Sequence, residues 1–272
     1  MITNNNGTYN VIVLPDCQVP FHSKPAIAAV EKYMAEYRWD EYVNLGDFLD
    51  FDQISKFNED SFRNIEGRRL RGDFYTANEI ILRHQAILQQ NNPKCKMTFL
   101  EGNHEYRVER FIDKFPALEG MLEVESNLMF KERGIKYVRC YSKGELYKIG
   151  KAYFHHGLYT VQNHAKKMVD NFGVNIFYGH VHDVQSYTKV AFGKNKTLVG
   201  HSLGCLCTYE QSYIGKNPKN WQHAFAVFHF QPNGFFNYYV VKIFDGKFIG
   251  PDGKTYDSYD NLSKGTKPLV SI

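Results

Sequence analysis

The stretch "KMTFLEGNHEYRVER" (residues 96–110) joins an apolar run to a charged segment through the turn Gly102-Asn103-His104-Glu105. The short run "KMTFL" is typical of a buried strand. An amide and an imidazole at the tip of a strand have two interpretations. Asn103 is either a helix cap with a surface His104 beside it, or a metal ligand with an acid next to it. The stretch alone does not decide, so the residues at the other strand ends become decisive.

Length and composition are those of one large domain. The chain has 272 residues, of which 43% are apolar, enough for a single sizeable core. We expect a flexible N-terminal tail at 1–8 and a single domain at 9–250. The remaining residues, 251–272, are polar and rich in turn formers, and we expect a C-terminal tail that either wraps the surface or is mobile.

Charge, cysteines and hydropathy exclude several classes of protein. No apolar run approaches the ~18 residues of a membrane span, and the polar N-terminus lacks a secretory signal. The five cysteines fit neither a disulfide framework nor a zinc pair, which indicates the reducing cytoplasm. Cys205 and Cys207 would share one face of a strand, more readily a packed face than a metal site. The net charge of +4 is too small for a dedicated nucleic-acid binder but is compatible with an anionic substrate.

The first half of the chain alternates between strand and helix patterns. Residues 9–14 ("YNVIVL") and 41–45 ("EYVNL") are short and apolar, as buried strands are. Between them, Ser23 and Pro25 mark the start of a helix. A strand, a helix and a strand within about 30 residues form a unit with parallel strands. A second helical pattern at 73–90 leads to the strand of the opening stretch.

The second half is richer in strands. A helix between Thr160 and Phe172 separates the first two of its strand patterns. The mixture predicts an α/β fold in which a parallel-rich sheet faces a second sheet, with helices outside. The six strand patterns are at 151–156, 174–180, 185–191, 196–204, 223–230 and 235–244.

Polar side chains follow the strands at the points where they end. Ligands collect outside the carboxyl ends of the strands in parallel α/β sheets, so we expect these side chains to meet. Each of these short motifs alone is weak evidence for a ligand site, because a lone Gly-Asp is more often a turn and a lone Asn more often a helix cap. The joint arrangement, all at strand ends, favours a site. Its members are Asp16 and Gln18, Asp47 and Asp50, Asn103 and His104, His155 and His156, and His180 and His182.

The residue types in this set indicate divalent cations. Carboxylates, an amide oxygen and imidazoles suit borderline or hard ions. A carboxylate can also bridge two ions about 3.5–4 Å apart, the geometry used on phosphate esters. In "GHVH", alternate strand positions would present His180 and His182 to one side.

These blocks resemble the calcineurin-like metallophosphoesterase superfamily. The family pattern is D-x-H, G-D-x-x-D, G-N-H-E/D, H-G and G-H-x-H, and the chain has "DCQ", "GDFLD", "GNHE", "HHG" and "GHVH" in that order. Four blocks match and the first departs. The resemblance implies a four-layer α/β/β/α sandwich of two mixed sheets flanked by helices, with a dinuclear metal centre. The matching blocks span residues 16–182, and the last third of the chain is matched only in its strand-rich character.

The resemblance also implies a role for each residue of the blocks. Asp47 would bridge the two ions, and His104 would be the general acid, steered by Asp50. His156 is the expected ligand of its block because it directly precedes the glycine, whereas His155 would lie outside the ligand set. The remaining ligands would be Asp16 and His182 on one ion, and Asn103, His156 and His180 on the other.

Gln18 stands where the family usually has histidine. A glutamine ligates through its amide oxygen but is a poorer donor for zinc or iron than imidazole. The first ion would then be weaker, exchangeable or biased toward manganese or magnesium. His22 would reach in as a substitute, or else would cap or cover the adjacent helix. The expected cofactors are two divalent ions, manganese first, with iron, zinc, nickel and magnesium as alternatives.

The predicted function is a metal-dependent phosphoesterase that hydrolyses a phosphate mono- or diester through a metal-activated hydroxide. His104 would protonate the leaving oxygen. Arg107, Asn103 and His22 are the expected substrate contacts. Arginine side chains bind phosphates well, so Arg110 and the cluster Arg63, Arg68, Arg69 and Arg71 are further candidates, with a solvated helix face as the alternative for the cluster.

Two other functions stay open. One is a nuclease of the repair-exonuclease type acting on nucleotide or nucleic acid, with Tyr209, Tyr213 and Trp221 either stacking on bases or packing. The other is a phosphate-binding protein of the same fold that has lost activity, with Gln18 as the lesion. A protein phosphatase is disfavoured because Phe51-Asp52 replaces the Arg-Gly usual after "GDxxD". The compact chain suggests a stand-alone enzyme of phage or bacterial origin, without a membrane partner.

Overall fold

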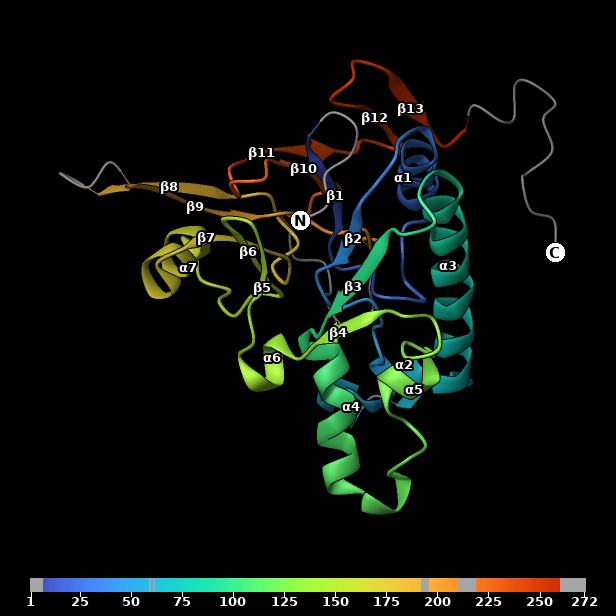
Figure 1. Cartoon of the computed structure of the whole chain (residues 1–272). Helices are drawn as coiled ribbons and strands as arrows, with labels where there is room; N and C mark the ends of the chain where they lie inside the picture. The colour runs from blue at the N-terminus through green and yellow to red at the C-terminus, as the bar shows by residue number, and fades with distance from the viewer. Residues whose placement is uncertain (1–6, 59, 61, 192–195, 210–218, 260–272) are drawn as a thin grey trace.

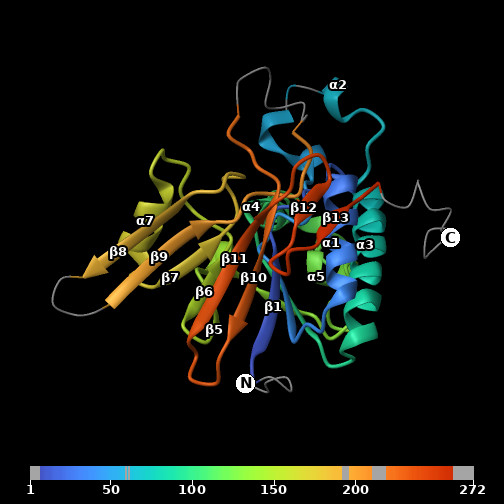
Figure 2. The ribbon, with the colours of Figure 1, turned by 90° about the horizontal axis from the view of Figure 1, so that it is seen from above.

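A computed structural model describes residues 7–58, 60, 62–191, 196–209 and 219–259. Two β-sheets face each other, and helices cover the outer face of each (Figure 1). Seen from above, the layers follow one another as helix, sheet, sheet and helix (Figure 2). The predicted α/β fold of two mixed sheets flanked by helices is therefore confirmed.

The first sheet is six-stranded, in the order β11-β10-β1-β2-β3-β4. Its four N-terminal strands run parallel, and β10 and β11 add an antiparallel edge. The parallel strands are short and nearly continuous in apolar residues because both of their faces are covered. The strands are β1 (Tyr9–Leu14), β2 (Glu41–Asn44), β3 (Lys96–Leu100), β4 (Lys136–Val138), β10 (Ala224–Phe230) and β11 (Phe236–Lys242).

Helices α1 (Lys24–Glu36) and α3 (Leu70–Asn91) cover the outer face of this sheet. The first begins as predicted, with the Ser23 side chain accepting a hydrogen bond from the backbone amide of Ala26. The apolar stripes of the two helices pack on alternate residues of β1, β2 and β3 in one continuous core.

The second sheet is five-stranded, in the order β5-β6-β7-β9-β8, and α7 (His164–Phe172) covers its outer face. Between the two sheets lies a second core, in which the rings of Phe177 and Phe228 are 4.7 Å apart. The strands are β5 (Tyr147–Ile149), β6 (Ala152–His155), β7 (Asn175–Tyr178), β8 (Ser186–Ala191) and β9 (Lys196–Ser202).

Residues beyond 250 contribute to the folded body. Strands β12 (Lys247–Ile249) and β13 (Thr255–Asp257) form a hairpin on α1, with the rings of Tyr33 and Tyr256 5.0 Å apart. Residues 251–259, assigned to the tail by sequence, are thus paired or packed. The predicted tail segments 1–6 and 260–272 lie outside the described residues.

Short elements complete the connections. The charged segment of the opening stretch is a helix, α4 (Asn103–Lys114). None of the helices that the structure describes has the length and apolarity needed to cross a membrane. The other short elements are α2 (Phe62–Ile65), α5 (Val124–Asn127), α6 (Cys140–Lys143), η1 (Asp52–Ile54), η2 (Lys56–Asn58) and η3 (Pro116–Leu118).

Candidate metal centre

The polar side chains predicted at the strand ends meet where the two sheets face each other. Strands β1, β2 and β3 of the first sheet and β6 and β7 of the second all point their carboxyl ends to this edge. The structure brings together Asp16, Gln18, Asp47, Asn103, His104, His156, His180 and His182.

One group of ligand atoms forms around Asn103. Its Oδ1 lies 3.0 Å from Nε2 of His156 and 2.8 Å from Nδ1 of His180. The Asp47 carboxylate lies 3.3 Å from the same His156 nitrogen. The other ring nitrogen of His156 donates a hydrogen bond to the Leu45 carbonyl at 3.0 Å, which fixes the tautomer and turns Nε2 toward the group.

A second group forms around His182. Its Nε2 lies 3.3 Å from the Asp16 carboxylate and 3.2 Å from the Gln18 amide. The amide nitrogen of Gln18 faces His182, and rotation of the amide by 180° would exchange this donor for the oxygen. Gln18 therefore lies beside the second group and could offer it an amide oxygen.

The two groups fit a pair of divalent cations. Asp47, His156 and His180 place one ligand atom each within 4.8 Å of one another, and Asp16, Asp47 and His182 do the same. Asp47 belongs to both groups, as a bridging carboxylate requires. The donors are oxygen and imidazole nitrogen, which suits manganese, iron, zinc or nickel.

Strained backbone holds these side chains. Non-glycine residues rarely adopt a positive φ, and such conformations collect at functional sites. Here Asp16, Gln18, Asp47, His180 and His182 have φ values of 26°, 49°, 47°, 72° and 62°. Five residues of the proposed centre therefore have left-handed backbone in the segments that follow β1, β2 and β7.

Two glycines allow the turns to approach one another. A Cβ on Gly102 would overlap the carboxylate of Asp47, and a Cβ on Gly179 would overlap the carboxylate of Asp16. Glycine is thus required at both positions by close backbone approach to a buried acid.

Glu105 holds the Asp47 turn in place. Its carboxylate accepts backbone N–H groups from Asp47 at 2.8 Å, Leu49 at 3.0 Å and Gly102 at 2.9 Å. The roles predicted from the sequence do not include one for Glu105. The available signal was its place three residues after Gly102, the spacing of a capping box at the start of a helix.

His104 lies beside the centre on the first turn of α4. Its Nδ1 is 2.7 Å from the backbone carbonyl of Asp50, so this nitrogen donates and the ring is fixed. Its Nε2 is 3.6 Å from the Asp47 carboxylate, and the ring lines the cavity over the centre. Arg107 donates to the same Asp50 carbonyl and to that of Phe51, at 2.8 and 3.1 Å.

The charges of the centre are strongly coupled. Burial disfavours the charged imidazole of His156, but the Asp47 carboxylate outweighs this and raises the pKa of His156 to about 9. Burial, together with the positive charge of His156, lowers the pKa of His180 to about 3. Burial raises the pKa of Asp16 above its usual value, although His182 beside it acts in the opposite direction.

Two predicted histidines lie away from the centre. His155 accepts a hydrogen bond from the backbone of Gly157 and packs on Phe172. His22 lines neither of the two large cavities. Its backbone bridges Cys207, and the charges that act on its ring are those of Lys24, Glu31, Arg83 and His84, on the α1 and α3 side. The substitute-ligand and substrate-contact roles of His22 thus lack a geometric basis, whereas covering the helix has one.

In the predicted arginine cluster, Arg68 has protein partners, whereas the other three arginines are exposed. Arg68 is paired with Asp52 and lies over the ring of Phe21, with 4.6 Å from its guanidinium carbon to the ring centroid. This residue therefore serves the fold. Arg63, Arg69 and Arg71 are exposed, as a solvated helix face would be.

Cys205 and Cys207, which the sequence predicted on a packed face of a strand, lie beside the His182 ring. Cys207 Sγ lies 3.9 Å from its Nδ1, and Cys205, Cys207 and His182 form a third group with metal-ligand spacing. Trp221 packs its edge against the His182 ring at 4.2 Å. Tyr209 stacks on His223 at 4.2 Å, in keeping with the packing alternative. Tyr213 lies outside the described residues.

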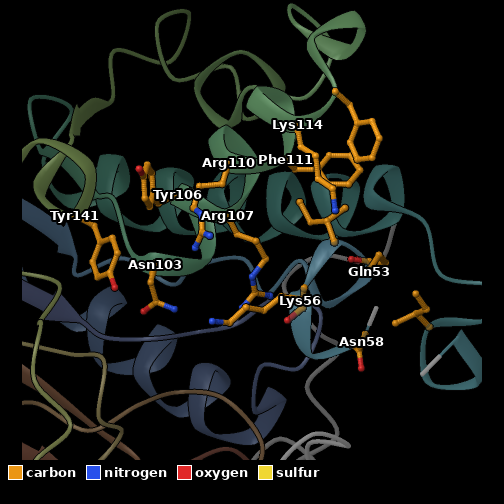
Figure 3. A pocket seen from close by; sticks show the side chains of 14 residues that line it. Gln53, Lys56, Asn58, Asn103, Tyr106, Arg107, Arg110, Phe111, Lys114 and Tyr141 are labelled. Carbon is orange, nitrogen blue, oxygen red and sulfur yellow. The ribbon is translucent and has the colours of Figure 1, made fainter. Parts of the chain in front are cut away.

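Two cavities meet at Asn103. One, of about 710 Å³, lies over the centre and is lined by Gln18, Asp47, His104, His180, His182 and Trp221 among others. The other, of about 760 Å³, runs along α4 (Figure 3). Asn103 lines both cavities, so the two adjoin at this residue.

Comparison with known proteins gives distant relatives. No family model matches the chain. The "Gene 54 protein" of Mycobacterium phage L5 is 24% identical over 281 residues, covering 91% of this chain and 98% of the phage protein. The phage protein is thus similar to this chain over almost its whole length.

Comparison with solved structures gives similarities at low sequence identity. Vps29 of Entamoeba histolytica, in complex with Zn²⁺, is 13% identical with a TM-score of 0.43, covering 92% of this chain and 99% of Vps29. The nuclease MPE of Pseudomonas putida is 12% identical with a TM-score of 0.38, covering 91% of this chain and 86% of the nuclease.

Proposed function

We propose that the chain is a calcineurin-like metallophosphoesterase that hydrolyses a phosphate mono- or diester. The supporting observation is the convergence of two ligand groups on one carboxylate, that of Asp47. Asp16, Gln18 and His182 would complete one cation site, and Asn103, His156 and His180 the other. Five free cysteine thiols agree with a place in the reducing cytoplasm.

The ions supply the electrophilic part of the chemistry. Two bound divalent ions, for which manganese is the first choice, would neutralise the ester oxygens and lower the pKa of a bound water. The chain itself supplies the geometry. Glu105 and the two close glycines, Gly102 and Gly179, fix Asp47 and Asp16, and the Leu45 carbonyl fixes the His156 ring.

His104 is the proposed proton donor to the leaving oxygen. Its Nδ1 is committed to the Asp50 carbonyl, so Nε2 is the nitrogen available to an ester in the cavity. Burial lowers the pKa of His104 to about 4, although Asp47 acts to raise it. An anionic ester beside Nε2 would favour the protonated ring, because a nearby negative charge raises the pKa of an imidazole. Substrate and proton would therefore be taken up together.

Metal content and turnover on small esters test the proposal. The manganese-loaded protein should hold close to two ions per chain and hydrolyse p-nitrophenyl phosphate or its bis ester. Asp47→Asn should lose both ions and all turnover, because it removes the shared ligand. Asp52→Asn is the matched control from the same loop, since Asp52 is paired with Arg68 and belongs to neither ligand group.

The results also separate an enzyme from a phosphate-binding protein of the same fold. Two bound ions without turnover on either ester, at any pH where the protein is folded, would refute hydrolysis. In that case Gln18→His, which restores the imidazole of the family pattern, should create turnover if Gln18 is the lesion.

A further inference from the structure

The cavity along α4 differs from the one over the metal centre in charge and shape. We call it the α4 groove. Figure 3 shows Asn103 and Tyr141 at one end of it and Phe111 and Lys114 at the other, with Arg107 and Arg110 between. The residues on which the inference rests are Lys56, Arg107, Arg110, Phe111, Lys114 and Tyr141.

The groove concentrates positive charge. Lys56, Arg107, Arg110 and Lys114 line it, and none of the described residues that line it is acidic. These four charges equal the net charge of the whole chain, +4. Arg110 has no acidic partner among the residues that the structure describes, and its side chain is exposed.

Helix α4 separates its charges by face. Arg107, Arg110 and Lys114 recur at helical spacing on the groove side. Glu109 lies on another side, where it pairs with Arg139 of the segment after β4. Glu105, Glu109 and Asp113, the acids of the helix, are not among the described residues that line the groove, which presents cations to an anionic ligand.

Aromatic side chains are placed at both ends of the groove. Tyr106 and Tyr141 lie 5.9 Å apart at the end near the metal centre, where Tyr141 is 6.4 Å from the His180 ring. Phe111 and Phe115 lie 4.9 Å apart at the far end. Flat rings alternating with cations are the features that bind unpaired nucleobases and the phosphates between them.

The length of the groove argues for a polymer. From Asn103 to Lys114 the helix rises ~16 Å, at 1.5 Å per residue. A mononucleotide or a small ester whose phosphate contacts the centre would leave the far cations and Phe111 unused. A strand with several phosphates would contact both ends at once.

We propose that the α4 groove binds single-stranded nucleic acid and presents one of its phosphodiester bonds to the metal centre. The cleavage part of this inference rests on the proposed function, and the binding part does not. In the reaction, water adds across the scissile P–O bond and leaves one phosphomonoester end and one hydroxyl end. Single strands are favoured because the rings can stack only on bases that are unpaired.

Binding is measured first, with the full chain in EDTA so that no cleavage occurs. The probe is a fluorescein-labelled oligothymidine of about 15 nucleotides, followed by anisotropy between about 50 and 200 mM salt. Arg110→Ala/Lys114→Ala should weaken binding at least tenfold and reduce the salt slope by about two, since two phosphate contacts are lost. Phe111→Leu should weaken binding about fivefold or more and leave the salt slope unchanged.

Lys94→Ala/Lys96→Ala is the matched control. It removes the same two charges at the amino end of β3, opposite to the end that leads into α4, and should bind as the unchanged chain does. Equal affinity and equal salt slope in the α4 variant and this control would overturn the inference. So would tighter binding of an acidic phosphopeptide than of the oligonucleotide.

Cleavage is measured next, with manganese, on the oligonucleotide and on bis(p-nitrophenyl) phosphate. The α4 double variant should lose at least tenfold in oligonucleotide cleavage relative to cleavage of the small ester, which is too short to span the groove. Hydrolysis of neither substrate, together with α4-dependent binding in EDTA, would refute the proposed function and leave the binding part supported. Hydrolysis of the small ester without α4-dependent binding would support the proposed function and refute the binding part.

Discussion

The Nδ1 atom of His104 lies 2.7 Å from the backbone carbonyl oxygen of Asp50 and 3.6 Å from the Asp50 carboxylate. The group that orients the proposed acid is thus a carbonyl, which a side-chain substitution leaves in place. Both carboxylate oxygens of Asp50 are buried and have no hydrogen-bond partner among the described residues. Burial raises the pKa of Asp50 to about 7, even though Arg107 acts to lower it.

This relationship predicts different results for the two residues. His104→Ala should reduce kcat by ~10²–10⁴-fold, because a positioned acid typically contributes that much, with two ions still bound. Asp50→Asn should reduce kcat by less than about tenfold, because the carbonyl still holds the ring. Steady-state kinetics and metal analysis of both variants check this. Equal losses would show that the carboxylate, rather than the carbonyl, sustains the acid.

Glu105→Gln should weaken the metal centre without touching a ligand. The carboxylate accepts three backbone N–H groups, and bonds of this charge-assisted kind contribute about 1.5–3 kcal/mol each. An amide retains only one acceptor atom, so one or two N–H groups lose their partner. We expect a loss of about 2–4 kcal/mol in the free energy of unfolding, together with weaker manganese binding, measured by denaturation and calorimetry. Unchanged metal affinity in a destabilised variant would separate Glu105 from the positioning of Asp47.

Gly102→Ala should disturb the site by overpacking. The added Cβ would overlap the carboxylate and backbone of Asp47, and such insertions cost about 1–3 kcal/mol. Gly72→Ala is the control, because it lies in α3 with open space around it and should stabilise the protein by about 0.5–1 kcal/mol. The free energy of unfolding should therefore fall for Gly102→Ala and rise for Gly72→Ala, and metal content should fall only for Gly102→Ala. A metal-replete Gly102→Ala would contradict the close approach.

Metal affinity should increase with pH. Burial disfavours the charge on His156, but Asp47 raises its pKa to about 9, so near neutral pH the ring of the metal-free chain carries the proton that a cation must displace. Affinity for manganese should therefore rise as pH rises from about 6, by up to tenfold per pH unit, and level off above about 9. Calorimetry in two buffers of different ionisation enthalpy measures the released protons. Metal binding without proton release would show that His156 is not a ligand.

His22→Gln should change acid stability and leave metal content unchanged. Burial, with Lys24 nearby, lowers the pKa of His22 to about 4, and its Nδ1 is buried without a partner among the described residues. The unfolded chain takes up this proton below about pH 6.5, so the folded state loses stability as pH falls from 6.5 to 4, by on the order of 2–3 kcal/mol. Denaturation at pH 7.5 and at pH 5 should show a smaller difference for the variant. A loss of bound ions would instead restore His22 as a ligand.

The sequence predicted the strands, and which polar side chains would meet at their ends, because both follow from local patterns. Asp16, Asp47, Asn103, His156 and His180 come at or just after the ends of apolar runs, and parallel strands bring such ends to one edge. No local pattern states how a side chain meets a backbone group far along the chain. The three N–H groups on Glu105 and the carbonyl that holds His104 are contacts of this kind.

The α4 groove was harder to predict for the same reason. Its cations are visible in the sequence as a charged segment, but which of them face a cavity depends on the phase of α4. The start of this helix stayed open in the sequence, because Asn103 fits a helix cap as well as a metal ligand, and the structure begins α4 at Asn103. The side to which the His22 ring turns could not be predicted, because its sequence distance from Gln18 carries no information about it.

Helix α4 begins with Asn103 and His104 and carries Arg107, Arg110 and Lys114 on the same rod. A helix has a fixed rise and a fixed rotation per residue. The proposed proton donor and the cations proposed to bind the strand therefore keep a fixed position relative to one another. It follows that the distance between the proposed site of hydrolysis and the phosphates bound farther along the strand is fixed by the number of helical turns between them. Lengthening α4 by one residue between His104 and Arg107 would rotate Arg107, Arg110 and Lys114 by ~100° about the helix axis. The cations would then no longer face the side on which the strand reaches the metal centre.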